Sequence, residues 1–77
     1  MRKIRVGGTY KHFKGHLYQV IGVARHSEDS KEEYVVYKAL SQSDEWPEGQ
    51  LWIRPIKMFL EKITREGKTF SRFEEIK

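Results

Sequence analysis

The sequence predicts a mainly β fold, a small SH3-like barrel of about five short strands with one short helical turn. Short runs rich in Val, Ile and Tyr alternate with turn-forming residues along the whole chain. With 77 residues, the chain suits one domain with one small core. Its four Phe, four Tyr and two Trp side chains could fill that core. An open α+β sheet is the main alternative.

Two strands and a tight turn are predicted at the start of the domain. We take residues 1–7 as a basic lead-in and residues 8–77 as the domain. Thr9–Phe13 and Leu17–Arg25 are the two strands. Gly15 lies in the turn between them, where glycine supplies the positive φ that tight hairpins need.

The middle of the chain predicts two more strands. Gly22, inside the second strand, indicates a bulge or the close approach of another group. Ser27–Glu33 is predicted as a polar loop and Tyr34–Leu40 as the third strand. A second loop over Ser41–Gln50 leads to a short fourth strand, Leu51–Ile53.

The C-terminal third predicts one helical turn and a final hairpin. Pro55–Leu60 is the helical turn, since proline suits the first position of a helix. Apolar residues recur there at helical spacing and are predicted to pack in the core: Ile56, Phe59, Leu60 and Ile63. Lys62–Ile76 is a last strand or hairpin that turns at Glu66-Gly67.

Charge is distributed unevenly along the chain. Residues 1–27 carry a net charge of +6 with no acidic residue, residues 28–50 carry −5, and residues 51–77 carry +3. Such a basic end is compatible with a phosphate-bearing partner, although charge also serves solubility. No apolar run reaches the roughly 20 residues that span a bilayer, and the basic start lacks a signal peptide's apolar segment. We therefore expect a cytoplasmic protein without a membrane partner.

Catalytic and metal sites receive little support. Cysteine is absent, which excludes disulfides and thiolate chemistry. Ser27 follows His26 directly, and neighbours on a strand point to opposite faces, so they cannot form a nucleophilic dyad there. His12, His16 and His26 could ligate zinc, but Lys14 would repel a cation and no carboxylate is close in sequence. We predict no catalytic residue, no metal ligand and no cofactor.

A surface of aromatic and basic side chains is better supported. Imidazole and guanidinium groups are rarely buried without a partner, so their clustering near the front of the chain indicates a binding surface. Small barrels bind peptides or single-stranded nucleic acid on aromatic shelves. The predicted ligand-binding residues are Tyr10, His12, Lys14, Arg25, His26, Trp52 and Arg54. Trp52 also suits the core.

Several spaced motifs together resemble a known family. The motifs are His12-Phe13-Lys14-Gly15, Arg25-His26-Ser27-Glu28, Val35-Val36-Tyr37 and Trp52-x-Arg54-Pro55. Together they resemble the small bacterial family called domain of unknown function 1653, from about Gly8 to Ile76. The resemblance implies a bacterial, cytoplasmic, single-domain protein that folds as a small β barrel. It implies no activity, because the family has none assigned.

Three hypotheses of function are compatible with these patterns. The first is a non-enzymatic binding module for an anionic ligand, with nucleic acid or a nucleotide ahead of an acidic peptide. The second is a protein-interaction module that binds a peptide or partner protein on an aromatic groove or an open sheet edge. The third is a small enzyme or accessory subunit that acts on a nucleotide-like substrate. Salt separates the first two, since phosphate binding weakens steeply with salt.

Overall fold

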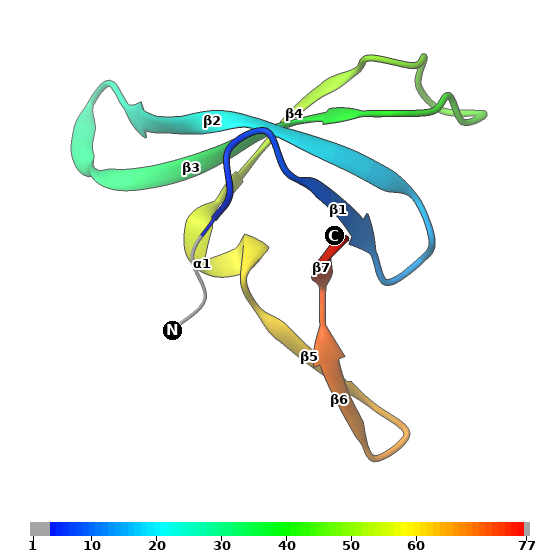
Figure 1. Cartoon of the computed structure of the whole chain (residues 1–77). Helices are drawn as coiled ribbons and strands as arrows, with labels where there is room; N and C mark the ends of the chain where they lie inside the picture. The colour runs from blue at the N-terminus through cyan, green and yellow to red at the C-terminus, as the bar shows by residue number, and fades with distance from the viewer. Residues whose placement is uncertain (1–3, 77) are drawn as a thin grey trace.

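The computed structural model describes residues 4–76, which form a curved five-stranded antiparallel sheet, a separate two-stranded hairpin and one helical turn (Figure 1). In chain order the elements are β1 Thr9–His12, β2 Leu17–His26, β3 Asp29–Ala39, β4 Leu51–Pro55, α1 Ile56–Phe59, β5 Lys62–Arg65, β6 Lys68–Ser71 and β7 Phe73–Ile76. The larger sheet has the order β4-β3-β2-β1-β7, so the long strand β2 is central.

The prediction of a mainly β chain with one short helical turn is confirmed, but a closed barrel is not found. Within residues 4–76 the outer strands β4 and β7 do not pair with each other, so the larger sheet has two open edges. Among the described residues the smaller sheet contains β5 and β6 alone. None of the helices formed by the described residues has the length and apolar character needed to cross a membrane.

The hairpin of β2 and β3 is longer than the sequence predicts. The segment Ser27–Glu33, predicted as a loop, instead contains the start of β3, with Glu33 opposite Arg25 and Asp29 opposite His26. The side chains of this end of the hairpin are exposed. This part of the strand is exposed on both faces, so its residues are polar without alternation. A polar run without alternation predicts a loop, which is why the sequence did not indicate a strand here.

A bulge in β2 adjoins Gly22, as predicted. The register shifts between Val20, which lies opposite Tyr37, and Gly22, which lies opposite Val36. A half-buried strand over Leu17–Arg25 predicts that Val20 and either Ile21 or Val23 are buried. Val20 is fully buried, as predicted, but the prediction for the other two residues is wrong, because Ile21 and Val23 are 46% and 41% exposed. Ile21 is the extra residue of the bulge, and beyond it β2 runs out of the core.

The core is mostly aromatic. Its buried members are Tyr10, Tyr18, Val20, Val35, Tyr37, Ala39, Phe59 and Phe73. Three of the four residues predicted to pack in the core as one helical stripe do so, because Phe59 is fully buried while Ile56 and Leu60 pack against the cluster. The prediction for Ile63 is wrong, because this residue lies in β5, is half-buried and is not part of the cluster. The α1 backbone begins directly after Pro55, and the Leu60 amide donates to the Ile56 carbonyl at 3.1 Å.

The C-terminal segment forms the predicted hairpin and one further strand. β5 and β6 turn at Glu66 and Gly67, whose φ angles of 52° and 77° are both positive, as a type I′ turn requires. β7 then pairs antiparallel with β1, placing Phe73 opposite His12. The described part of the predicted lead-in also contacts the sheet, because the Arg5 amide donates to the Tyr10 hydroxyl at 3.0 Å. Residues 1–3 and 77 lie outside the described part of the chain.

Candidate functional site

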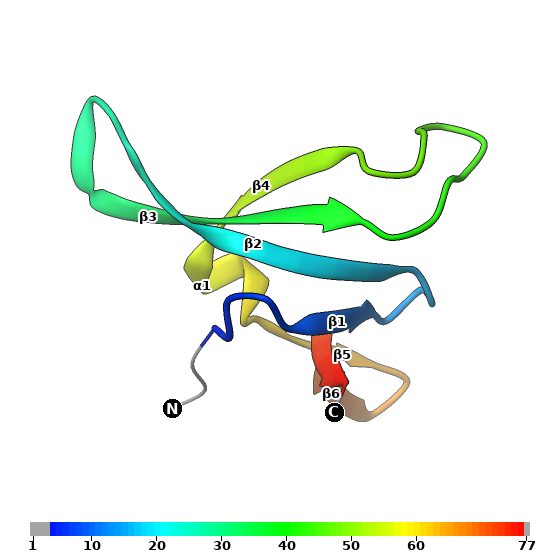
Figure 2. The same ribbon diagram turned by 45° about the horizontal axis from the view of Figure 1, so that its top comes forward.

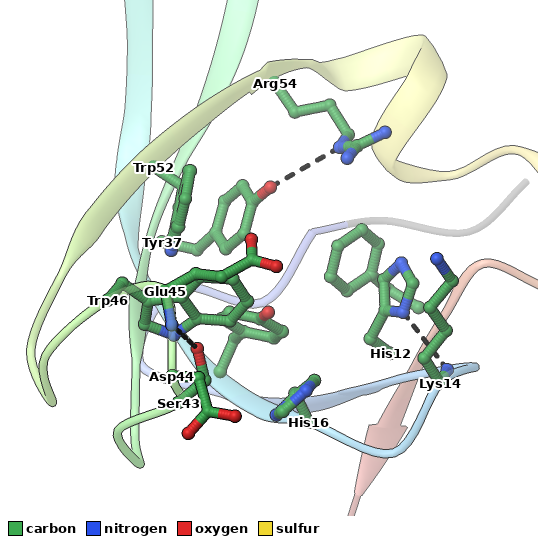
Figure 3. Close-up of a pocket in the computed structure, with 12 residues that line it drawn as sticks. His12, Lys14, His16, Tyr37, Ser43, Asp44, Glu45, Trp46, Trp52 and Arg54 are labelled. Atoms are coloured by element: carbon green, nitrogen blue, oxygen red, sulfur yellow. Dashed lines mark hydrogen bonds between the residues drawn. The ribbon is translucent and has the colours of Figure 1, made fainter.

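A cleft of about 670 Å³ opens beside the aromatic core (Figure 3). Residues of the β1–β2 turn and of the β3–β4 loop contribute to its lining. These two segments come to the same end of the molecule, opposite the tip of the β2–β3 hairpin (Figure 2). The lining residues are His12, Lys14, His16, Tyr18, Tyr37, Ser43, Asp44, Glu45, Trp46, Trp52, Arg54 and Phe73. The cleft thus combines cations, carboxylates and aromatic rings.

Arg54 provides a positioned cation on one side of the cleft. Its Nε donates to the Tyr37 hydroxyl at 3.4 Å, and its guanidinium carbon lies 5.6 Å from the centroid of the Phe73 ring. These two contacts use one N–H group and one flat face of the guanidinium. Among residues 4–76, neither Arg54 nor Lys14 forms a salt bridge with a carboxylate. Arg54 can therefore offer further donors to a ligand carboxylate or phosphate.

His12 lies beside these cations, and its pKa is lowered. Burial, together with the charges of Arg54, Arg72, Lys14 and His16, lowers the pKa of His12 from 6.5 to about 4. Its Nδ1 also accepts a hydrogen bond from the Lys14 amide at 3.1 Å, which protonation of that atom would remove. The ring is therefore neutral at pH 7, chiefly because of its burial. The neighbouring positive charges add to this effect and make this side of the cleft electropositive.

Two tryptophans form the aromatic side of the cleft. Trp46, from the β3–β4 loop, and Trp52, from β4, meet edge to face with ring centroids 5.2 Å apart. Both are half-buried and pack against the core cluster. Trp52 therefore lines the cleft and also packs against the core. Its indole nitrogen is buried and has no hydrogen-bond partner among residues 4–76.

The β3–β4 loop supplies an acidic wall. Asp44 and Glu45 line the cleft across from His12 and Lys14 (Figure 3). The loop is held by backbone bonds, from the Ser43 amide to the Trp46 carbonyl and from the Gly49 amide to the Ala39 carbonyl, both at 2.9 Å. Both carboxylate side chains are exposed, and within the described range neither forms a salt bridge.

The structure brings together four of the predicted ligand-binding residues and separates three. His12, Lys14, Trp52 and Arg54 all line the cleft. The other three do not line it.

Tyr10 is 3% exposed and belongs to the core. Its aromatic ring fills space beside Phe59, with the two centroids 5.3 Å apart. Arg25 and His26 lie on the β2–β3 hairpin, where an Arg25 terminal nitrogen donates to the Ser30 carbonyl at 2.8 Å.

Several residues of the cleft lining are not among the predicted ligand-binding residues. The acidic segment Asp44-Glu45 with its adjacent Trp46 was visible in the sequence as an unusual loop composition. Phe73 carried no such signal, because it reaches the cleft only through the pairing of β7 with β1. His12 and His16 share the cleft, whereas His26 lies on the hairpin. Within residues 4–76 no three His, Asp or Glu side chains gather closely enough to hold a metal ion.

Comparisons with known proteins identify relatives but no activity. The model of the family described as a protein of unknown function, DUF1653, matches residues 8–75. A crystal structure of a DUF1653 protein from Bordetella bronchiseptica is similar, with a TM-score of 0.79 and 29% sequence identity. That similarity covers 99% of this chain and 91% of the other. A search of curated proteins found no match.

Proposed function

The chain belongs to the DUF1653 family, and we propose that it is a non-enzymatic binding module whose cleft takes an anionic ligand, a nucleotide or a short nucleic acid. The position of Arg54 carries this proposal. Its guanidinium is oriented at the cleft by Tyr37 and Phe73, yet no carboxylate among residues 4–76 neutralises it. A donor group held in place before binding loses less conformational freedom when the ligand arrives.

The surroundings of Arg54 support an anion rather than a cation. Lys14 adds a second charge without a salt-bridge partner in the described range. Burial is the main cause of the lowered pKa of His12, and the positive charges of Arg54 and Lys14 lower that pKa further. Trp46 and Trp52 add flat apolar surface nearby. Stacking of a nucleic-acid base on such a ring contributes roughly 1–3 kcal/mol. A nucleotide satisfies both features.

The proposal is tested by titrating the protein with a short single-stranded oligonucleotide and with nucleotides at low and moderate salt. Amide chemical shifts should change around the cleft, at His12, Lys14, Trp52 and Arg54. The slope of log K against log salt should be roughly −0.7 for each phosphate of a single strand that is neutralised. Absence of binding at low salt, or shift changes confined to the β2–β3 hairpin, would contradict the proposal.

A matched pair of lysine variants sharpens this experiment. Lys14→Ala should weaken binding and make the salt slope shallower, because Lys14 lines the cleft. Lys57→Ala removes the same charge from an exposed position on α1 outside the cleft lining and should change neither quantity. Equal effects of the two substitutions would show that only the net charge matters.

A second function is favoured by the outer edge of the sheet. Among the described residues β4 pairs with β3 alone, and its side chains Leu51 and Ile53 are 58% and 66% exposed. Such an edge can receive an extended peptide as an additional strand. Binding of this kind should change little with salt and should be blocked by Ile53→Lys. A steep salt dependence that survives Ile53→Lys would exclude the edge as the binding site.

A further inference from the structure

We propose that the cleft binds one nucleotide unit, a base with a terminal phosphate, free or at the end of a strand, in preference to the interior of a strand. This inference rests on the proposed function and narrows its ligand. It follows from the polarity of the cleft, which has cations on one side and carboxylates on the other (Figure 3).

The basic side suits a terminal phosphate. Arg54 and Lys14 together can face the charge of a phosphate monoester, which is about −1.5 to −2 at neutral pH, whereas an internal phosphodiester carries one charge. The Arg54 guanidinium has a fixed orientation, between the Tyr37 hydroxyl and the Phe73 ring, and can donate two parallel hydrogen bonds to phosphate oxygens.

The acidic side excludes a second phosphate. A strand that continued across the cleft would bring its next phosphate towards Asp44 and Glu45, and these like charges would repel each other. These carboxylates can only accept hydrogen bonds at neutral pH. They therefore suit the amino group of a base such as cytosine, which presents a donor where uracil presents an acceptor.

The size of the cleft agrees with a single unit. A volume of about 670 Å³ falls within the range of pockets that hold one small ligand, roughly 300–1,000 Å³. Trp46 and Trp52 lie beside the acidic wall, so a base held by Asp44 or Glu45 has an aromatic neighbour. The phosphate of the ligand would thus lie at the basic side of the cleft and its base at the acidic side.

Tryptophan fluorescence reports on this cleft directly. The chain has two tryptophans, and both line the cleft. We would titrate the protein with cytidine 5′-monophosphate, uridine 5′-monophosphate, cytidine, inorganic phosphate, and tetradeoxycytidylate with or without a 5′-phosphate. Cytidine 5′-monophosphate should bind at least tenfold more tightly than cytidine or phosphate and severalfold more tightly than uridine 5′-monophosphate. The phosphorylated oligonucleotide should bind about tenfold more tightly than the unphosphorylated one.

Carboxylate variants test the reason for the preference. Glu45→Gln and Asp44→Asn should reduce the advantage of the phosphorylated oligonucleotide and of cytosine over uracil. Glu48→Gln, in the same loop but outside the cleft lining, should leave both ratios unchanged. If the unphosphorylated oligonucleotide binds as tightly as the phosphorylated one, the single-unit inference is overturned while the proposed function stands. If no anion changes the fluorescence or the amide shifts, both are overturned.

Discussion

The rings of Phe59 and Phe73 stack face to face, with centroids 4.1 Å apart and planes 7° apart. This contact joins α1 to β7, two elements that do not pair through their backbones in the described chain. Phe73 also lines the cleft. The centroid of its ring lies 4.9 Å from the centroid of the His12 ring and 5.6 Å from the guanidinium carbon of Arg54. Phe73 therefore belongs both to the core and to the lining of the cleft.

Phe59→Ala should destabilise the protein strongly. Phe59 is fully buried and contacts Tyr10, Tyr37 and Phe73. Truncation of a buried aromatic side chain costs on the order of 3–5 kcal/mol, a large share of the stability of a small domain. Thermal or denaturant unfolding measures the loss. Met58→Ala, on the same helical turn but 44% exposed, is the control and should change little. Equal melting temperatures for the two variants would contradict this assignment of the core.

His12 should titrate with a pKa of about 4 in the folded protein. Its unfolded value is about 6.5, so between these values the unfolded state binds more protons. The contribution of His12 to stability is complete above pH 6.5, is lost as the pH falls towards 4, and changes no further below that. The His12 imidazole resonances, followed by NMR, should show this titration. The stability of His12→Asn should depend less on pH over that range, and a folded-state pKa near 6.5 would contradict the arrangement.

Anion binding should raise the pKa of His12. A phosphate at Arg54 and Lys14 would oppose the positive charges that now lower this pKa. Binding should then become tighter as the pH falls from the raised pKa of His12 in the complex towards its value of about 4 in the free protein, with uptake of a proton. Calorimetric titrations in buffers of different ionisation enthalpy measure the proton uptake directly. An unchanged His12 pKa in a saturated complex would place the ligand elsewhere.

Gly15→Ala should destabilise the turn that carries Lys14. Gly15 has a φ of +107°, which alanine adopts only with strain, so the cost should exceed roughly 1 kcal/mol. Gly22→Ala is the matched control, because Gly22 has no positive φ and an added Cβ meets no atom within 4 Å. Unfolding experiments on the two variants compare them. A similar stability for both would show that the turn does not need the glycine conformation.

The elements that sequence reasoning identified best are those whose signals are local. Gly15, Gly67 and Pro55 mark turns and a helix start through their own backbone preferences, and the structure has these features in place. The open sheet and the position of Phe73 depend on the pairing of β7 with β1, which joins distant parts of the chain and leaves no local pattern.

The candidate site shows the same contrast. The residue types of His12, Lys14, Trp52 and Arg54 suggested binding, and the fold brings these four to one cleft. The same residue-type reasoning placed Arg25 with them, but the β2–β3 hairpin extends beyond the core and carries it away. The distance between Arg25 and the cleft depends on the length of the β2–β3 hairpin, which the residue types alone do not indicate.

A comparison of Arg54→Gln with Arg25→Gln tests the central claim most directly. Each substitution removes one positive charge, but Arg54 lines the cleft and Arg25 lies on the hairpin. The measurement is the affinity for cytidine 5′-monophosphate at low salt, with thermal melts to confirm that both variants are folded. If the cleft is the binding site, Arg54→Gln should weaken the affinity at least tenfold, while Arg25→Gln should change the affinity by less than twofold. Equal weakening, or a larger effect of Arg25→Gln, would contradict the cleft as the anion site.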